Sequence, residues 1–175
     1  VLWFDTDRFQ TTEQESNNIN RYKQALLLIT TLRGIPQLYY GDELGMFASK
    51  KDGDGWLRQD FPAPALEAVG RSSLQKEYFD YAKRLLNWRK GCKAVQWGEL
   101  KHFACQKGCY VYSRSLGNQR VTVFMNGTNE AQTLTLERYA EVLPAFRGKD
   151  ILTDKLIDLS GTLTLQPRQS VVIDF

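Results

Sequence analysis

The chain has 175 residues, of which 42% are hydrophobic and 12% aromatic, so it can bury the core of one domain or of two small ones. Its 23 basic and 20 acidic residues are spread along the sequence and leave a net charge of only +3, which argues against nucleic acid as a partner. The longest apolar run, residues 25–29, is far shorter than the roughly 20 residues that span a bilayer, so we expect no membrane partner.

The first 40 residues are predicted to form a strand, a helix and a second strand. Residues 1–4 (VLWF) favour a strand, and the polar residues 10–18 are predicted to be a loop. Asn18 is a good N-cap for the helix, which we expect to end at Gly34. The apolar face of this helix consists of Tyr22, Ala25, Leu26, Ile29 and Leu32. Residues 35–40 (IPQLYY) suit a strand buried on both faces of a parallel sheet, which completes a βαβ unit.

A long connection and a second helix follow. Residues 42–72 are rich in Gly, Asp and Pro, and they exceed the usual length of loops in compact domains, so we expect a functional or disordered segment. Ser72 and Gln75 form a capping box for a helix that Gly91 closes. One face of that helix carries Tyr78, Tyr81, Ala82, Leu85 and Trp88. Residues 1–90 are thus predicted as β-α-β-α, with the long loop at the carboxyl end of the second strand, where ligand sites form.

From about residue 92 the hydrophobic period becomes two, which predicts strands. The alternating runs are residues 101–105, 109–115, 121–127, 132–137, 162–167 and 170–175. Short turn signals separate them, as is typical of an antiparallel β-sandwich. A short helical turn is predicted around Arg138 to Leu143.

The three cysteines are Cys92, Cys105 and Cys109. The chain has one histidine and no Cys-x-x-Cys pair, which argues against a zinc site. Two interpretations stay open. All three residues are reduced, partly buried thiols, or Cys105 and Cys109 form a disulfide across the Gln-Lys-Gly turn, which would also require an oxidising compartment.

One motif resembles a known family. Gly34, Pro36, Gly41 and Glu43 match the Gly-x-Pro-x-x-x-x-Gly-x-Glu pattern at the eighth barrel strand of α-amylase-type glycoside hydrolases (family 13). The stretches LLNWRKG, GELKHF, YVYSR and TLQPRQSVVIDF are similar to the cyclomaltodextrinase, neopullulanase and maltogenic amylase branch. The resemblance implies an α/β plus all-β fold. The last βαβα portion of a (β/α)8 TIM barrel would occupy residues 1–90, and a C-terminal antiparallel β-sandwich would occupy residues 91–175.

The resemblance also implies site residues near the N-terminus. VLWFDTDRF is similar to the end of the seventh-strand motif, which makes Asp5 the candidate for the third carboxylate, the one that stabilises an oxocarbenium-like transition state. Arg8 follows as a substrate-lining residue. The family has Asn-His where this chain has Trp3 and Phe4, so the substrate-contacting histidine is absent. The alternative for Asp5 is a solvated acid at a frayed terminus. Glu43 is implied to be a substrate-lining residue that orients the barrel mouth rather than the acid.

The acidic part of the long loop allows three interpretations. Its charged and aromatic residues considered as a cluster are Asp52, Asp54, Trp56, Arg58 and Asp60. Trp56 and Arg58 suit sugar stacking and hydroxyl contact, which favours a substrate-lining loop. Calcium is the second interpretation, although the spacing does not fit an EF-hand, and a solvated loop is the third. We expect neither a cofactor nor a metal.

Aromatic residues also recur in the predicted sandwich, namely Trp97, Phe103, Tyr110, Tyr112 and Phe124. They form either the core or a carbohydrate-stacking platform, and burial of one face of each sheet favours the core. His102 has no partner motif nearby, so we expect a structural role for it.

The function that the resemblance implies is hydrolysis of α-1,4-glucans with retention, on starch, maltooligosaccharides or cyclodextrins. The strands that carry two of the family's three catalytic carboxylates have no counterpart here, so we expect this chain alone to be inactive. Two barrel strands cannot close a barrel, so we expect the barrel portion to be covered by self-association or a partner chain, to be rearranged, or to be poorly ordered. The alternative function is a non-catalytic carbohydrate-binding or interaction module.

Overall fold

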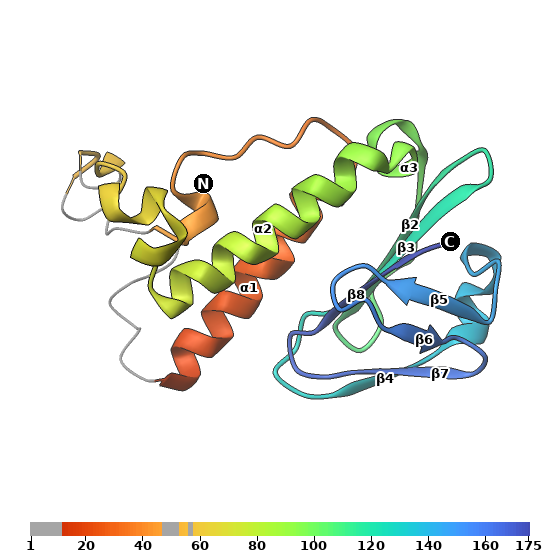
Figure 1. The fold of residues 1–175 in the computed structure, drawn as a ribbon. Coiled ribbons are helices and arrows are strands. Elements are labelled where there is room, and N and C mark those ends of the chain that lie inside the picture. Colours follow the sequence, from red (N-terminus) through yellow and green to blue (C-terminus); the bar gives the residue numbers. More distant parts are fainter. Residues whose placement is uncertain (1–11, 47–52, 56–57) are drawn as a thin grey trace.

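The computed structural model describes residues 12–46, 53–55 and 58–175. Helices α1 (Thr12–Thr31) and α2 (Ser73–Gly91) run side by side, and the short α3 (Lys93–Trp97) leads from α2 into the strands (Figure 1). The described residues between α1 and α2 include the short 3-10 helices η2 (Asp42–Leu44), η5 (Ala63–Leu66) and η6 (Ala68–Gly70). No helix among the described residues has the length and apolar character of a membrane span.

The strands of the described residues form two sheets in which every pairing is antiparallel. The larger sheet has six strands in the order β1-β2-β3-β8-β5-β6. Their bounds are Glu99–His102 (β1), Cys109–Leu116 (β2), Gln119–Asn126 (β3), Ser170–Asp174 (β8), Arg147–Asp150 (β5) and Leu156–Asp158 (β6). The smaller sheet pairs β4 (Gln132–Thr135) with β7 (Thr162–Leu165), and the 3-10 helix η7 (Leu136–Val142) follows β4.

The central strands of the larger sheet are buried on both faces. Val123 and Val172 belong to the core that the sheet shares with the helices, whereas Phe124 and Val171 face the core shared with β4, β7 and η7. This alternation follows from the pleat, which sends successive side chains to opposite faces. The six-stranded sheet is therefore the middle layer, with helices on one side and the small sheet on the other.

The antiparallel sheet domain agrees with the sequence-based expectation. All six predicted strand runs contain observed strands, and the predicted helical turn is η7. Strands β5 and β6 were not predicted, because RGKD has no apolar side chain to alternate and LID is only three residues long. Tyr112 and Phe124 are fully buried, as the core interpretation requires, whereas Trp97 is 75% exposed. His102 lies on the exposed edge strand β1.

The start of α1 differs from the prediction. The helix begins at Thr12, so the loop predicted over residues 10–18 is wrong from residue 12 onward, and Asn18 lies inside the helix rather than at its N-cap. This stretch contains Glu and Gln, which favour helices, and it has no Gly or Pro to interrupt one. The capping box of α2 is confirmed, since the Gln75 N–H donates to Ser72 Oγ at 3.2 Å and the Ser72 N–H donates to Gln75 Oε1 at 3.0 Å.

The strand predicted at residues 35–40 is not formed. This segment runs between α1 and η2 as an irregular chain, and Ile35 is 96% exposed. A buried parallel strand needs neighbours on both sides to supply hydrogen bonds, and no parallel pairing occurs among the described residues. The predicted βαβ unit, and with it a barrel portion, is therefore not shown. The strand predicted at residues 1–4 lies outside the described residues.

The hairpin between β1 and β2 decides between the two cysteine interpretations. Gln106 and Cys109 exchange backbone hydrogen bonds of 3.1 and 2.8 Å around a two-residue turn. Lys107 (φ 50°) and Gly108 (φ 70°) are both left-handed, as a type I′ turn requires. Cys109 thus lies opposite Gln106 and not opposite Cys105. Cys109 and Cys92 are buried, Cys105 is exposed, and all three are free thiols.

Candidate functional site

The described part of the family-like motif forms a tight turn after the irregular segment. Gly41 (φ 88°) and Gly45 (φ 66°) flank η2, and both have the left-handed backbone that favours glycine. The N–H groups of Leu44 and Met46 both donate to the Gly41 carbonyl, each at 3.0 Å. We call residues 39–46 the carboxylate turn, because Asp42 and Glu43 lie at its centre.

Both carboxylates of this turn accept hydrogen bonds from its own backbone. Glu43 Oε2 accepts the Gly41 N–H at 2.9 Å, and Asp42 Oδ2 accepts the Tyr39 N–H at 2.9 Å. Both residues are half-buried. The turn is therefore a rigid unit, and its two acids are engaged in holding it.

Two tyrosine rings stand at the start of the turn. The centroids of Tyr39 and Tyr40 are 4.5 Å apart with an interplanar angle of 39°, and their residues are 48% and 45% exposed. Tyr40 Oη donates to the Gln59 carbonyl at 3.0 Å, which joins the turn to the loop that carries Arg58 and Asp60. The pKa of Tyr40 is raised by desolvation, then by its contact with Tyr39 and the nearby charge of Asp60.

The sequence-predicted site residues are only partly described. Asp5, Arg8, Asp52 and Trp56 lie outside the described residues. Arg58 is exposed, and its charge opposes the rise in the pKa of Tyr40, so it lies near that ring. The turn and the 58–60 loop are thus brought together through a tyrosine.

Sequence reasoning missed Tyr39 and Tyr40 as site residues, because both were assigned to a buried strand. The signal that could have identified them is their position directly before Gly41-Asp42-Glu43. Within the described ranges, no group of three His, Cys, Asp or Glu side chains could hold a metal ion. Exposed aromatic rings beside charged and amide groups can stack on the apolar face of a sugar and bind its hydroxyls.

The strands of this chain resemble a known protein family. Residues 100–174 match the profile of the cyclo-malto-dextrinase C-terminal domain, which spans nearly the whole set of strands. Neopullulanase 2 of Thermoactinomyces vulgaris is 28% identical over 177 residues, an alignment that covers 97% of this chain and 28% of that protein. The cyclomaltodextrinase of Thermoanaerobacter pseudethanolicus is 26% identical and covers 97% of this chain and 27% of that protein. The chain is similar to the C-terminal region of α-amylase-family enzymes, glycoside hydrolase family 13.

The α-amylase fold relationship extends to solved structures. The α-amylase of Geobacillus thermoleovorans, solved in complex with acarbose, superposes with a TM-score of 0.69 at 24% identity. That superposition covers 89% of this chain and 33% of the enzyme. The chain therefore spans about a third or less of the length of these α-amylase-family relatives. The matched profile covers the strands, and the carboxylate turn lies outside it.

Proposed function

We propose that this chain is the C-terminal part of a retaining glycoside hydrolase that acts on α-1,4-glucans such as starch, maltooligosaccharides and cyclodextrins. The observation that carries the proposal is the exposed Tyr39–Tyr40 pair on a rigid carboxylate turn, in a chain whose strands match a cyclomaltodextrinase domain. The related Geobacillus enzyme was solved with acarbose bound, which supports an α-glucan-like oligosaccharide as the ligand class.

We further propose that residues 1–90 end a (β/α)8 barrel and that residues 91–175 form the domain that follows it. Support comes from the irregular segment 35–40, which is apolar and lies directly between α1 and the carboxylate turn. Upstream strands would supply its missing ladder partners. Without them, Ile35 stays in water, and we expect the isolated chain to self-associate there. Sedimentation would detect this as a mass that rises with concentration, and a compact monomer at all concentrations would contradict it.

In the proposed site, Asp5 stabilises the transition state and Arg8, Trp56 and Arg58 line the substrate. Glu43 contributes through the geometry of its turn, because its carboxylate accepts the Gly41 N–H. The chain alone should not hydrolyse glucans, since retention needs a nucleophile and an acid on opposite sides of the scissile bond, and the family resemblance assigns both to upstream strands.

Two assays test this function on the 175-residue chain. The first measures reducing-sugar release from β-cyclodextrin and maltoheptaose, where we expect no release above background. Release that Asp5→Asn abolishes would contradict the proposal, because the chain would then possess a complete catalytic site. The second measures maltoheptaose affinity by calorimetry. We expect Tyr40→Ala to weaken it about tenfold, the effect of losing one stacking ring of about 1–1.5 kcal/mol. Phe146→Ala, which removes an exposed ring far along the chain, is the matched control.

A second candidate function is sugar binding by the strand domain itself, and one observation favours it. Trp97 is the member of the five sandwich aromatics that stays mostly exposed, at 75%. Its backbone is fixed, because the Gly98 N–H donates to the Ala94 carbonyl at 2.9 Å and a Cβ at Gly98 would lie 2.5 Å from the Ser115 carbonyl oxygen. Loss of maltoheptaose binding in Trp97→Ala, with Tyr40→Ala unaffected, would favour this function over the first.

A further inference from the structure

One tyrosine of α1 reaches the carboxylate turn from the core beneath the helices. Tyr22 is 3% exposed and belongs to the core between the helices and the six-stranded sheet. Its hydroxyl donates to the backbone carbonyl of Asp42. The same carbonyl accepts the Gly45 N–H at 3.1 Å, so the two bonds meet at the first residue of η2.

A second ring completes this support. Tyr78 of α2 packs edge-on against Tyr22, with centroids 4.7 Å apart and an interplanar angle of 85°. The turn lies directly on Tyr78, because a Cβ added at Gly45 would come within 2.5 Å of that ring. Leu44, between the two contacts, is buried. The turn is thus seated on both helices through one hydrogen bond and one aromatic surface.

The hydroxyl of Tyr22 is not required for packing. A phenylalanine would fill the same volume in the core, so the hydroxyl contributes chiefly through its bond to Asp42. Burial raises the pKa of Tyr22, and the nearby charges of Asp42 and Glu43 raise it further. The hydroxyl is therefore protonated at neutral pH and acts as a donor.

We propose that Tyr22 is a positioning residue for the sugar site, in that its hydroxyl sets the placement of the carboxylate turn and so of Tyr39 and Tyr40. This inference rests on the proposed function for its ligand, an α-glucan chain. The path from Tyr22 to the rings is short: Tyr22 holds the Asp42 carbonyl, and the Asp42 carboxylate holds the Tyr39 N–H. Loss of the hydroxyl leaves a half-buried carbonyl with one donor fewer and loosens the turn.

The test compares two Tyr→Phe variants of the 175-residue chain. Tyr22→Phe removes the bond to Asp42. Tyr81→Phe is the matched control, because Tyr81 Oη also donates to a backbone carbonyl between the helices, that of Lys23, at 3.1 Å. Amide hydrogen exchange is followed at Leu44, Gly45 and Met46, whose N–H groups bond within the turn. Thermal midpoints are measured for both variants, so that a general loss of stability is recognised.

We expect Tyr22→Phe to speed exchange at these three amides about fivefold, the factor for one lost hydrogen bond. Amide exchange in β3 should not change in either variant, and Tyr81→Phe should leave amide exchange in the carboxylate turn unchanged. Unchanged exchange in Tyr22→Phe, or equal acceleration in both variants, would overturn the proposal.

Maltoheptaose affinity is a separate readout. A severalfold weaker affinity in Tyr22→Phe, with Tyr81→Phe unchanged, would support the positioning role of Tyr22. Full affinity in Tyr22→Phe despite faster exchange in the turn would overturn that role. If the unsubstituted chain fails to bind maltoheptaose while Tyr22→Phe exchanges faster, the proposed function fails and the placement of the turn by Tyr22 is still supported.

Discussion

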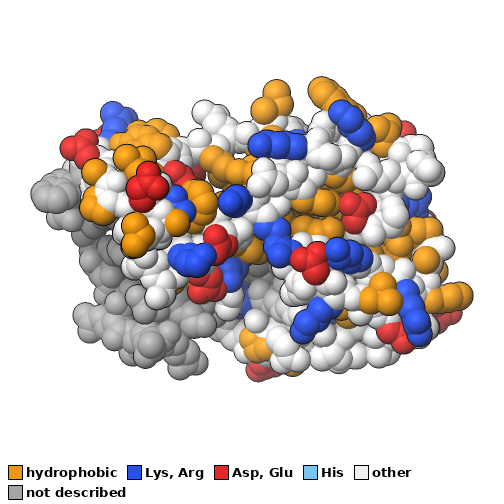
Figure 2. Space-filling model, viewed as in Figure 1, with side chains coloured by type: hydrophobic (Ala, Val, Ile, Leu, Met, Phe, Trp, Pro, Cys, Tyr) orange, Lys and Arg blue, Asp and Glu red, His pale blue; other side chains and the backbone are white. Residues whose placement is uncertain are grey.

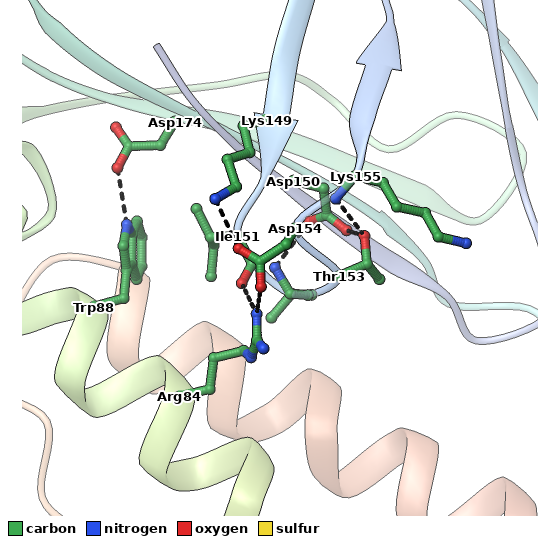
Figure 3. Close-up of polar contacts among 10 residues, drawn as sticks. Arg84, Trp88, Lys149, Asp150, Ile151, Thr153, Asp154, Lys155 and Asp174 are labelled. Atoms are coloured by element: carbon green, nitrogen blue, oxygen red, sulfur yellow. Dashed lines mark hydrogen bonds and ion pairs between the residues drawn. The ribbon is translucent and has the colours of Figure 1, made fainter.

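Trp88 and Asp174 join the second helix to the last strand, because the indole Nε1 donates to Asp174 Oδ2 at 2.8 Å (Figure 3). A second link lies beside it, where Arg84 donates to Asp154 Oδ2 at 2.6 Å and to the Ile151 carbonyl at 3.1 Å. Both links run between α2 and the strands. The turn that receives Arg84 is itself held by the buried Asp150, whose Oδ1 accepts the backbone N–H of Val172 at 3.0 Å.

Loss of the indole bond should be measurable as a loss of stability. We expect Trp88→Phe to lower the free energy of unfolding by about 1.5–3 kcal/mol, since the acceptor is a carboxylate and the site is partly buried. Urea titration gives this value. Trp97→Phe is the control and should change it by less than about 0.5 kcal/mol, because Trp97 is exposed. Equal losses in the two variants would show that the Trp88–Asp174 bond contributes nothing specific.

Strong acid should weaken the Arg84–Asp154 link. Lys149 and Arg84 lower the pKa of Asp154 from its ordinary value of 3.8 to about 2. A carboxyl with a lowered folded-state pKa adds stability above its unfolded pKa, and this contribution is lost as the pH falls from about 4 to about 2.

The comparison is a series of thermal midpoints from pH 7 to pH 2 for the unsubstituted chain and Asp154→Asn. Asparagine tolerates the left-handed backbone at this position (φ 61°), so the substitution removes charge without adding strain. We expect the two midpoints to converge as the pH falls through this window. A constant difference would mean that the charge of Asp154 does not stabilise the fold.

Arg114 of β2 should be among the most sensitive positions. It is 2% exposed, and it donates to the Thr31 carbonyl at 2.9 Å and to the Gly98 carbonyl at 2.8 Å. Burial lowers its pKa, as do the nearby charges of Arg89 and Arg33. Arg114→Met leaves two carbonyls without this donor and should cost about 2–3 kcal/mol of unfolding free energy.

The matched control is Arg120→Met on the adjacent strand. Arg120 also donates to a backbone carbonyl, that of Glu141, but the bond is exposed, so we expect a loss below about 1 kcal/mol. Equal losses of unfolding free energy in the two variants, measured by chemical denaturation, would show that burial does not strengthen the contribution of the Arg114 hydrogen bonds to stability.

The three thiols should differ sharply in reactivity. Burial raises the pKa of both Cys92 and Cys109, which lowers their thiolate fraction, while Cys105 is exposed. Labelling with iodoacetamide at pH 8 should therefore show one fast site and two slow ones. Cys105→Ser should abolish the fast phase. Persistence of that phase in Cys105→Ser, or three equal rates, would contradict the burial of the other two thiols.

Local patterns were sufficient where the interaction they describe is local. The capping box at Ser72 and Gln75 uses atoms three residues apart, so its sequence signature predicted the start of α2 correctly. The alternating runs predicted β2, β3 and β8 for the same reason, since the pleat alone decides which residues share a face. The candidate site was predicted only in part, because Tyr39 and Tyr40 look like strand residues until the backbone around them is known.

The sequence by itself determined the antiparallel strand domain and the second helix. Tertiary structure alone decided that residues 35–40 are not a strand, that Cys105 and Cys109 are not opposite each other, and that Tyr22 reaches the Asp42 carbonyl. The physical reason is the range of the interactions. Helix capping, turns and the strand pleat depend on residues a few positions apart in the sequence. Strand partners, hairpin register and helix-to-turn contacts depend on groups that only folding brings together.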